Sequence, residues 1–279
     1  MSGADPTAAA VRRGARLAIL GAGVMGETLL AGLLRAGWSA DDVVVTDRRP
    51  ERCQELVARY GVGVAGNADA VEGAETVVVV VKPQDLDDLL DEIGPRLADG
   101  VLLVSLCAGV TTARIESRVG PGVAVVRVMP NTPAQVSQGM AAISAGAHAS
   151  ADDLARVHTM LAATGRVVTV PERYQDAVTA ISGSGPAYLF YVVESMIEAG
   201  VQLGLPRDTS TELVVQTMLG SATLLSQTGG HPTELREMVT SPGGTTAAAV
   251  RTLEQHGVRA AFMAAIEAAR DRSQLLSGE

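Results

Sequence analysis

The sequence predicts an α/β protein with a Rossmann-type doubly wound sheet at the N-terminus and an all-helical C-terminal domain. Three observations lead to this prediction. From Arg16 to Pro171, apolar runs of strand length alternate with helix-length segments, as βαβ units require. A glycine-rich turn with the spacing G-x-G-x-x-G follows the first of these runs. After Pro171 the strand signal ends, and helical segments separated by glycine and proline replace it.

The predicted elements follow one another in a regular order. Helical patterns at Glu27–Ala36 and Glu51–Tyr60 stop at Gly37 and Gly61, the positions where helices commonly end. The predicted strands are the runs LAIL, DVVVTD, VGVA, TVVVVV, VLLVSL, VAVVRV, MAAI and VVTV. Because these runs are apolar throughout, we expect a parallel sheet that is buried on both faces.

The C-terminal helices are unusually apolar. We expect Pro186 to open a helix that ends at Gly200, and Pro206 to open the next one. The second helix contains Gly220, which is tolerable where another helix packs closely. Helices that are apolar on nearly every side must be buried on more than one face, so we expect this domain to complete its core against another subunit.

Length sets the domain organisation. With 279 residues, the chain exceeds the usual size of one domain, so either two domains or one large α/β unit with an appendage is expected. We assign residues 1–15 to a flexible tail, 16–171 to the dinucleotide-binding domain and 172–279 to the helical substrate-binding and dimerisation domain.

Composition disfavours several classes of function. A net charge of −9 would repel nucleic acid, and no apolar run approaches the length of a membrane-spanning helix. Cys53 and Cys107 form neither a disulfide framework nor a metal-ligand pattern, which favours a reducing cytoplasm. No metal site is predicted, because the histidines are scattered and expected at the surface: His148, His158, His231 and His256.

The glycine turn predicts a dinucleotide site. Gly21 allows the tight turn, Gly23 lets the backbone approach a pyrophosphate, and Gly26 lets helix and strand pack closely. The start of the following helix would face the anion. Asp47 closes the second strand near the spacing expected of a ribose-binding acid.

The residues around the second strand do not decide between NADH and NADPH as the cofactor. Asp47 fits the ribose of NADH, whereas Arg48 and Arg49 fit the 2′-phosphate of NADPH unless they form a solvated pair. We favour NADPH, with NADH as the alternative. Lys82, the only lysine, ends a central strand and either faces the cofactor or is a solvated edge residue. Asn131 either contacts the nicotinamide or ties its own turn.

The stretch VTSPGGTT, residues 239–246, predicts a second anion site. A glycine-rich loop that feeds a helix presents free N–H groups and the positive end of the helix dipole. Ser241, Thr245 and Thr246 add hydroxyl groups; the alternative is a simple N-cap without a ligand. No strong acid or base accompanies them. A substrate with a carboxylate and an already protonated imine suits such a pocket, because hydride addition then gives a neutral amine.

Several motifs together resemble the pyrroline-5-carboxylate reductase family. They are MVTSPGGTTAAAVRTLE, DAVTAISGSGPAYLF, VKPQ, CAGVT and RVMPNTPA, and the similarity runs from about Arg16 to Leu275. The resemblance implies hydride transfer from NADPH or NADH to 1-pyrroline-5-carboxylate, which gives L-proline. It also implies a dimer that interleaves its helical domains, and often a decamer of five dimers.

The resemblance also assigns site residues. It places the pyrophosphate on Gly21, Ala22, Gly23, Val24 and Met25, the adenosine ribose near Arg48, Arg49 and Asn67, and further cofactor contacts at Val81, Lys82 and Ala108. It places the substrate carboxylate on Ser241, Gly243, Gly244, Thr245 and Thr246, with Thr246 near the ring nitrogen as the catalytic residue and Glu172 as a weaker candidate for the same pocket.

Two other functions are weighed against this one. A β-hydroxyacid dehydrogenase combines a similar first domain with helices, but its catalytic lysine near Pro186 is missing here. A non-catalytic cofactor sensor would not need the hydroxyl-rich loop. The family often has small polar residues where this chain has Asp47, Arg48 and Arg49, so its cofactor preference is not transferred.

Overall fold

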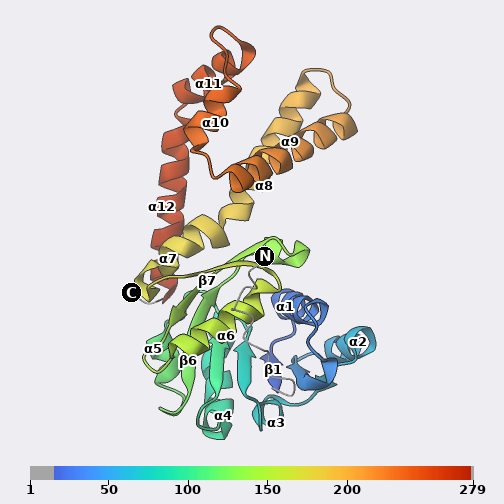
Figure 1. Ribbon diagram of the computed structural model, residues 1–279, viewed down its shortest axis with the longest axis vertical. Helices are drawn as coiled ribbons and strands as arrows, with labels where there is room; N and C mark the ends of the chain where they lie inside the picture. Colours follow the sequence, from blue (N-terminus) through green and yellow to red (C-terminus); the bar gives the residue numbers. More distant parts are fainter. Residues whose placement is uncertain (1–15, 278–279) are drawn as a thin grey trace, which may run out of the picture. The chain divides into compact units, whose positions relative to one another are not determined.

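The computed structural model describes residues 16–277, so the predicted tail at 1–15 lies outside the described part (Figure 1). The chain forms two compact units. The first runs to Gly183 and includes the segment from Asp271 onward, and the second is Ser184–Arg270. Residues 172–183 thus belong to the first compact unit, and the functional division after Pro171 stays a prediction.

An eight-stranded sheet with the order β3-β2-β1-β4-β5-β6-β7-β8 forms the centre of the first unit. All eight predicted apolar runs become strands. Their bounds are β1 (Leu17–Leu20), β2 (Val43–Thr46), β3 (Gly63–Val64), β4 (Thr76–Val79), β5 (Leu102–Ser105), β6 (Ala124–Met129), β7 (Gly139–Ala145) and β8 (Gly165–Thr169). The strand order reverses at β1 and β4, which places a topological switch point at their carboxyl ends, where open α/β sheets bind ligands.

The prediction of a parallel sheet is wrong for the last two strands. β7 runs antiparallel to β6, and β8 runs parallel to β7. The cause is the short connection at residues 130–138, which holds only a 3₁₀ turn, η4 (Thr132–Val136). A parallel neighbour would need a crossover of a dozen or more residues.

Helices cover both faces of this sheet. The predicted helices at Glu27–Ala36 and Glu51–Tyr60 are confirmed as α1 and α2, and Gly37 and Gly61 follow them at φ 94° and 69°. The α-helices are α1 (Val24–Arg35), α2 (Pro50–Tyr60), α3 (Asn67–Val71), α4 (Leu86–Ile93), α5 (Thr112–Glu116), α6 (Ala151–Ala162) and α7 (Gln175–Val178). The shorter turns are η1 (Ala40–Asp42), η2 (Pro83–Asp85), η3 (Gly94–Arg96), η5 (Glu172–Tyr174) and the π-type turn η6 (Thr179–Gly183).

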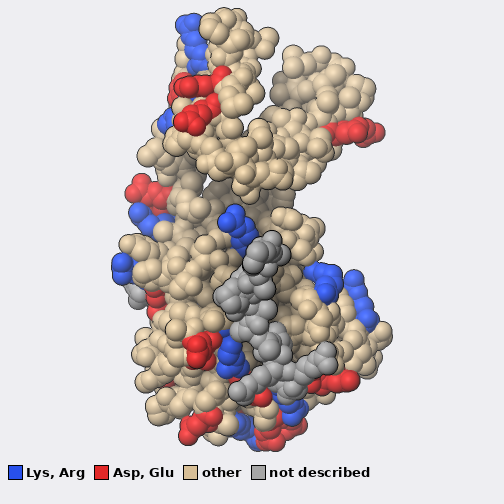
Figure 2. Space-filling view, viewed as in Figure 1, with Lys and Arg blue, Asp and Glu red and all other residues tan. Residues whose placement is uncertain are grey.

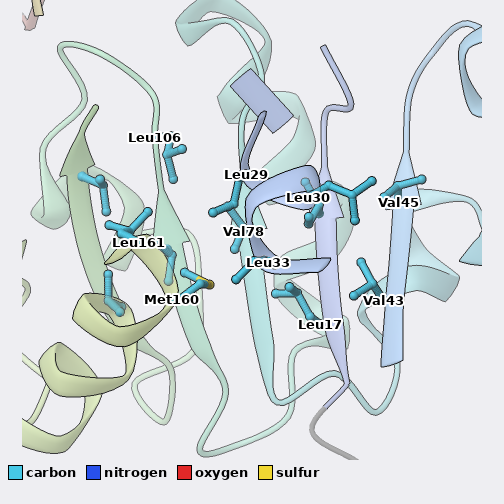
Figure 3. Packing of buried hydrophobic residues seen from close by; sticks show 14 of the residues in the cluster. Leu17, Leu29, Leu30, Leu33, Val43, Val45, Val78, Leu106, Met160 and Leu161 are labelled. Carbon is cyan, nitrogen blue, oxygen red and sulfur yellow. The ribbon is translucent and has the colours of Figure 1, made fainter. Parts of the chain in front are cut away.

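Two apolar clusters, one on each side of the sheet, hold the first unit together. In the first, Leu29, Leu30 and Leu33 of α1 pack with Met160 and Leu161 of α6 against the strands (Figure 3). The second joins the other face to α3, α4 and α5. Because the strands are covered on both sides, every residue of β1, β4 and β5 is buried.

The second unit is helical, as predicted. Its helices are α8 (Gly185–Gln202), α9 (Arg207–Thr228), α10 (Pro232–Met238), α11 (Thr245–Gln255) and the part of α12 (Val258–Ser277) that ends at Arg270. Pro186 opens α8, but the predicted stop at Gly200 is wrong, because α8 continues to Gln202. Gly200 is needed inside the helix: a Cβ there would lie 2.1 Å from Ser210 Oγ of α9.

The second unit leaves most of its apolar side chains exposed. No side chain of α8 is fully buried, and Val214 is the buried apolar residue of α9. On the face seen in Figure 2, the surface of α8 and α9 consists almost entirely of uncharged residues. Exposed members include Leu189, Phe190, Tyr191, Leu213 and Leu219. The helix expected to pack on Gly220 is not found in the described part of this chain, since nothing lies within 4 Å of a Cβ built there. These features support the expectation that another subunit completes the core.

An ion pair between a buried arginine and a half-buried carboxylate fastens the start of residues 172–178 to the sheet. Arg127 on β6 is only 4% exposed, and its Nη1 donates to Glu172 Oε1 at 3.2 Å. The same carboxylate accepts from the backbone N–H and the hydroxyl of Thr112, both at 2.7 Å, at the start of α5. Glu172 therefore neutralises a buried arginine and the N-terminus of a helix.

We predict that Glu172→Ala lowers the free energy of unfolding by about 3–5 kcal/mol, because Arg127 would remain buried without a partner. Urea unfolding measures this change. Glu72→Ala is the matched control: Glu72 pairs with Arg96 at the surface at 2.9 Å, so its loss is expected to change stability by less than about 0.5 kcal/mol. Unchanged stability with weaker substrate binding would instead favour the substrate role that the resemblance gives Glu172.

Candidate active site

The glycine turn between β1 and α1 has the geometry that its spacing predicts. Gly21 adopts φ 102°, and a Cβ there would lie 2.7 Å from the carbonyl oxygen of Val80. The N–H groups of Gly21 and Ala22 both donate to Thr46 O at 3.0 Å, which ties the turn to β2. A Cβ at Gly26 would lie 2.2 Å from Gly21 O, so the third glycine permits the close packing of α1 on the turn.

The start of α1 is open to a ligand. Gly23 is the N-cap residue, no side chain caps the helix, and nothing lies within 4 Å of a Cβ built on Gly23. Val24 is 66% exposed and Met25 is half-buried. The N–H groups of the first turn have no partner within the helix, so they and the dipole fit a pyrophosphate.

Asp47, Arg48 and Arg49 lie directly after β2 and are already paired. Asp47 Oδ1 accepts from the backbone N–H of Arg49 at 2.9 Å and from its Nε at 3.2 Å. Arg48 makes a bidentate contact with Asp85 of η2, at 2.6 and 3.2 Å. Both arginines are largely exposed. Each could turn to a phosphate, but only in exchange for its carboxylate partner.

Asn67 lies beside these residues at the start of α3. Its Oδ1 accepts from the Thr46 hydroxyl at 2.7 Å, and its Nδ2 donates to Glu92 at 3.0 Å. The amide thus links the end of β2, directly before Asp47 and the arginine pair, to α4.

Val81, Lys82 and Ala108 follow β4 and β5 at the carboxyl edge of the sheet. Lys82 is exposed and makes no ion pair with any residue that the structure describes. Ala108 is exposed on the turn after β5. Between them lies Cys107, whose thiol contacts Val81 O at 3.3 Å; burial raises the pKa of Cys107 to about 11, so this thiol is not a nucleophile at neutral pH.

Asn131 ties its own turn. Its Oδ1 accepts from Met140 N at 2.8 Å, and its Nδ2 donates to the Ser182 carbonyl at 3.2 Å. These bonds hold the connection between β6 and β7, so the geometry favours the turn-tying alternative over contact with the nicotinamide.

The loop at Ser241–Thr246 lies in the second compact unit and opens α11. Gly243 adopts φ 70°, and Gly244 is the N-cap residue. The hydroxyls of Ser241, Thr245 and Thr246 do not cap the helix, because no side-chain cap is formed. The alternative of a simple hydroxyl N-cap is therefore not realised, and the first N–H groups of α11 are available to an anion.

No titratable side chain lies within residues 241–246. Ser241 and Thr245 are exposed, and Thr246 is half-buried. The four histidines are all exposed, as predicted. Within residues 16–277 no group of three or more His, Cys, Asp or Glu side chains could hold a metal ion.

Sequence reasoning missed two neighbours of the glycine turn. Arg52 Nε donates to Ala22 O at 2.9 Å, and Asp85 holds Arg48. Both contacts join residues that lie far apart in sequence, so no local spacing announces them. The three arginines within residues 48–52, Arg48, Arg49 and Arg52, are the signal in the sequence for the first contact.

Two family profiles match different parts of the chain. Residues 172–276 match the family profile described as pyrroline-5-carboxylate reductase dimerisation. Residues 16–109 match the profile described as NADP oxidoreductase, coenzyme F420-dependent.

Relatives of known name cover nearly the whole chain. It is 44% identical to the pyrroline-5-carboxylate reductase of Corynebacterium melassecola over 93% of this chain and 98% of that protein. The corresponding enzyme of Glycine max is 39% identical over 94% and 96%.

Solved structures agree with these relatives. The pyrroline-5-carboxylate reductase of Coxiella burnetii superposes with a TM-score of 0.90 at 34% identity, covering 95% of this chain and 99% of that one. The Plasmodium falciparum enzyme, solved with NADP bound, gives a TM-score of 0.84 at 29% identity over 95% and 99%. With its glycine turn, its hydroxyl-rich loop and this full-length similarity, the chain belongs to the pyrroline-5-carboxylate reductase family.

Proposed function

We propose that this chain reduces 1-pyrroline-5-carboxylate to L-proline, that the start of α11 binds the substrate carboxylate, and that the start of α1 binds the cofactor pyrophosphate. The reaction class follows from the family: the chain is an NAD(P)H-dependent oxidoreductase that acts on a C–N bond. The observation that carries the substrate position is the uncapped start of α11, where Ser241 lies before the helix and Thr245 and Thr246 are its first two residues.

The residues at α1 fit a dinucleotide. The space over Gly23, the open first turn and the buried contact at Gly26 together form a cradle that any larger side chain would fill. When bound, NAD(P)H supplies the hydride. The protein contributes N–H donors from Gly23 to Met25, while Arg48, Arg49 and Asn67 take the adenosine end, and Val81, Lys82 and Ala108 line the carboxyl edge of the sheet.

The residues at α11 fit a small carboxylate. The N–H groups of the first turn and the dipole of this 11-residue helix favour negative charge at that end. The Ser241 hydroxyl adds a donor, and Gly243 and Gly244 let the backbone come close. These contacts would fix the substrate by its acid group and leave its ring free to be oriented.

Thr246 is the residue that we assign to the ring nitrogen. A protonated imine carries one N–H, which the threonine hydroxyl oxygen can accept. Hydride addition to the imine carbon then neutralises the positive nitrogen, so no proton has to be delivered in that step. This accounts for a pocket whose loop has no titratable side chain.

The competing functions are less well supported. The only lysine of the chain is Lys82, so the catalytic lysine of β-hydroxyacid dehydrogenases has no counterpart near Pro186. A non-catalytic sensor would not explain an uncapped α11 with hydroxyl groups at its start. The full-length similarity to named reductases also favours the enzyme.

The chain associates with itself through its helical part, as the dimerisation profile and its exposed apolar helices indicate. We extend this to a decamer of five dimers, which the family resemblance implies, and to a cytoplasmic location. The second proposal is supported by Cys53 and Cys107, which are both buried and unpaired thiols. In the described residues, no helix combines the length and apolarity needed to cross a bilayer.

The activity itself is tested directly. We expect incubation with 1-pyrroline-5-carboxylate and NADPH to oxidise the cofactor and form proline, measured as loss of absorbance at the nicotinamide band and by amino-acid analysis. An absence of turnover with both NADPH and NADH would overturn the proposed function.

Thr246→Ala is expected to lower kcat/KM for 1-pyrroline-5-carboxylate by about 10–100-fold, because a charge-assisted hydrogen bond to the ring nitrogen is lost. The dissociation constant for NADPH should stay unchanged. Thr252→Ala is the control on the same helix, since the Thr252 hydroxyl is bonded to Ala248 O at 3.1 Å within α11. If both variants lose activity equally, Thr246 has no special role.

The double variant Arg48→Ala/Arg49→Ala tests our preference for NADPH. Loss of the contacts to the 2′-phosphate should reduce kcat/KM with NADPH by about 10–100-fold and leave NADH nearly unaffected. Steady-state kinetics with both cofactors give the ratio. Arg96→Ala, which removes a surface charge paired with Glu72, is the control. Equal losses with both cofactors would contradict the preference.

A further inference from the structure

Arg52 on α2 reaches across to the glycine turn. Its Nε donates to the carbonyl oxygen of Ala22 at 2.9 Å, and its Nη2 donates to the carboxylate of Glu27 in the first turn of α1. Its Nη1 also contacts Glu55 at 3.1 Å. The side chain is 18% exposed, so all three bonds are shielded in part from water. One guanidinium thus connects α2, the glycine turn and α1.

The bond to Ala22 fixes a neighbouring donor. A trans peptide group is planar, so the Ala22 carbonyl and the Gly23 N–H lie in one plane and point in opposite directions. None of the peptide bonds in the described residues is cis. Holding the carbonyl toward α2 therefore directs the Gly23 N–H away from α2. That N–H belongs to the group of donors at the open start of α1, where nothing occupies the space over Gly23.

The bond from Arg52 to Glu27 compensates the negative charge of Glu27 near the expected pyrophosphate. A carboxylate in the first turn of a helix interacts well with the dipole, but it would repel a pyrophosphate bound at the same end. Glu27 is surrounded by Arg52, by Arg59 at 2.7 Å and by the hydroxyl of Tyr60 at 2.9 Å. Burial alone would raise the pKa of Glu27, but the hydrogen bonds from Arg52 and Tyr60 and the charges of both arginines outweigh it and lower that pKa. Glu27 thus stays ionised and keeps its ion pair with Arg52.

We infer that Arg52 is a positioning residue for the cofactor: it orients the Ala22–Gly23 peptide so that the Gly23 N–H faces the pyrophosphate, and it compensates the charge of Glu27. This inference rests on the proposed placement of the pyrophosphate at α1. Arg52 acts on the cofactor position through the backbone of the glycine turn. Because NADH and NADPH share the pyrophosphate, Arg52 should matter equally for both, unlike Arg48 and Arg49.

Arg52→Gln tests the inference in the full-length protein. We expect the dissociation constants for NADPH and for NADH, measured from the fluorescence of the bound nicotinamide, to rise by the same factor of roughly 10–30. At saturating cofactor, kcat and the KM for 1-pyrroline-5-carboxylate should stay within about twofold, because the substrate loop is untouched.

Arg59→Gln is the matched control. It removes the same charge from α2 and the same kind of contact to Glu27, but Arg59 does not bond to the glycine turn. We expect it to raise both dissociation constants by less than about threefold. Equal effects of the two variants would show that net charge alone matters, and the positioning role would be overturned.

Two further outcomes are distinguishable. If Arg52→Gln fails to fold, Arg52→Lys keeps the charge but cannot bond to both Ala22 and Glu27 with the same fork, so a weaker affinity for both cofactors is still expected. Wild-type affinity in a folded Arg52→Gln or Arg52→Lys variant would refute the inference while leaving the proposed function intact. If the wild-type protein itself binds neither cofactor, the proposed function fails first.

Discussion

Both candidate binding positions depend on the same constraint: the first N–H groups of a helix have no partner inside the helix. At α1 and α11 the N-cap residue is a glycine, Gly23 and Gly244, and no side chain takes those donors. Side chains cap only some of the other helices. Ser150 and Asp153 form a capping box on α6, and Thr111 caps α5. Because the starts of α2, α3, α8 and α9 also lack a side-chain cap, what distinguishes α1 and α11 is the glycine turn before α1 and the hydroxyl groups at the start of α11.

The two compact units obtain their stability differently. The first unit buries strands between two layers of helices and has a complete core within one chain. The second unit has many apolar side chains on its helices but buries few of them, and nothing in the described chain lies within 4 Å of a Cβ built on Gly220 of α9. A helical unit of this kind needs a partner to cover it. Self-association is therefore needed to bury the apolar helices of the second unit, in addition to any role at the active site.

The sequence predicted those features that are local. Strands buried on both faces leave continuous apolar runs, so all eight were found, and the glycine spacing located the turn at Gly21. It could not give the direction of β7, which depends on how far residues 130–138 reach. It also could not tell Gly200, which faces Ser210 inside a helix, from a glycine that ends one. The partners of Glu172, Arg48 and Arg52 are distant in sequence, and only the folded chain shows them.

The paired arginines after β2 show why residue type alone does not fix cofactor preference. Arg48 and Arg49 would each give up a carboxylate, Asp85 or Asp47, in order to bind a 2′-phosphate. The net gain is then the difference between two charge-assisted contacts, and both contacts are exposed and screened by salt. A phosphate carries more charge than a carboxylate and can accept from both arginines at once, which favours the exchange. Preference for NADPH therefore depends on the strength of the resting pairs as much as on the presence of the arginines, and Asp85 has as direct a part in it as Arg48.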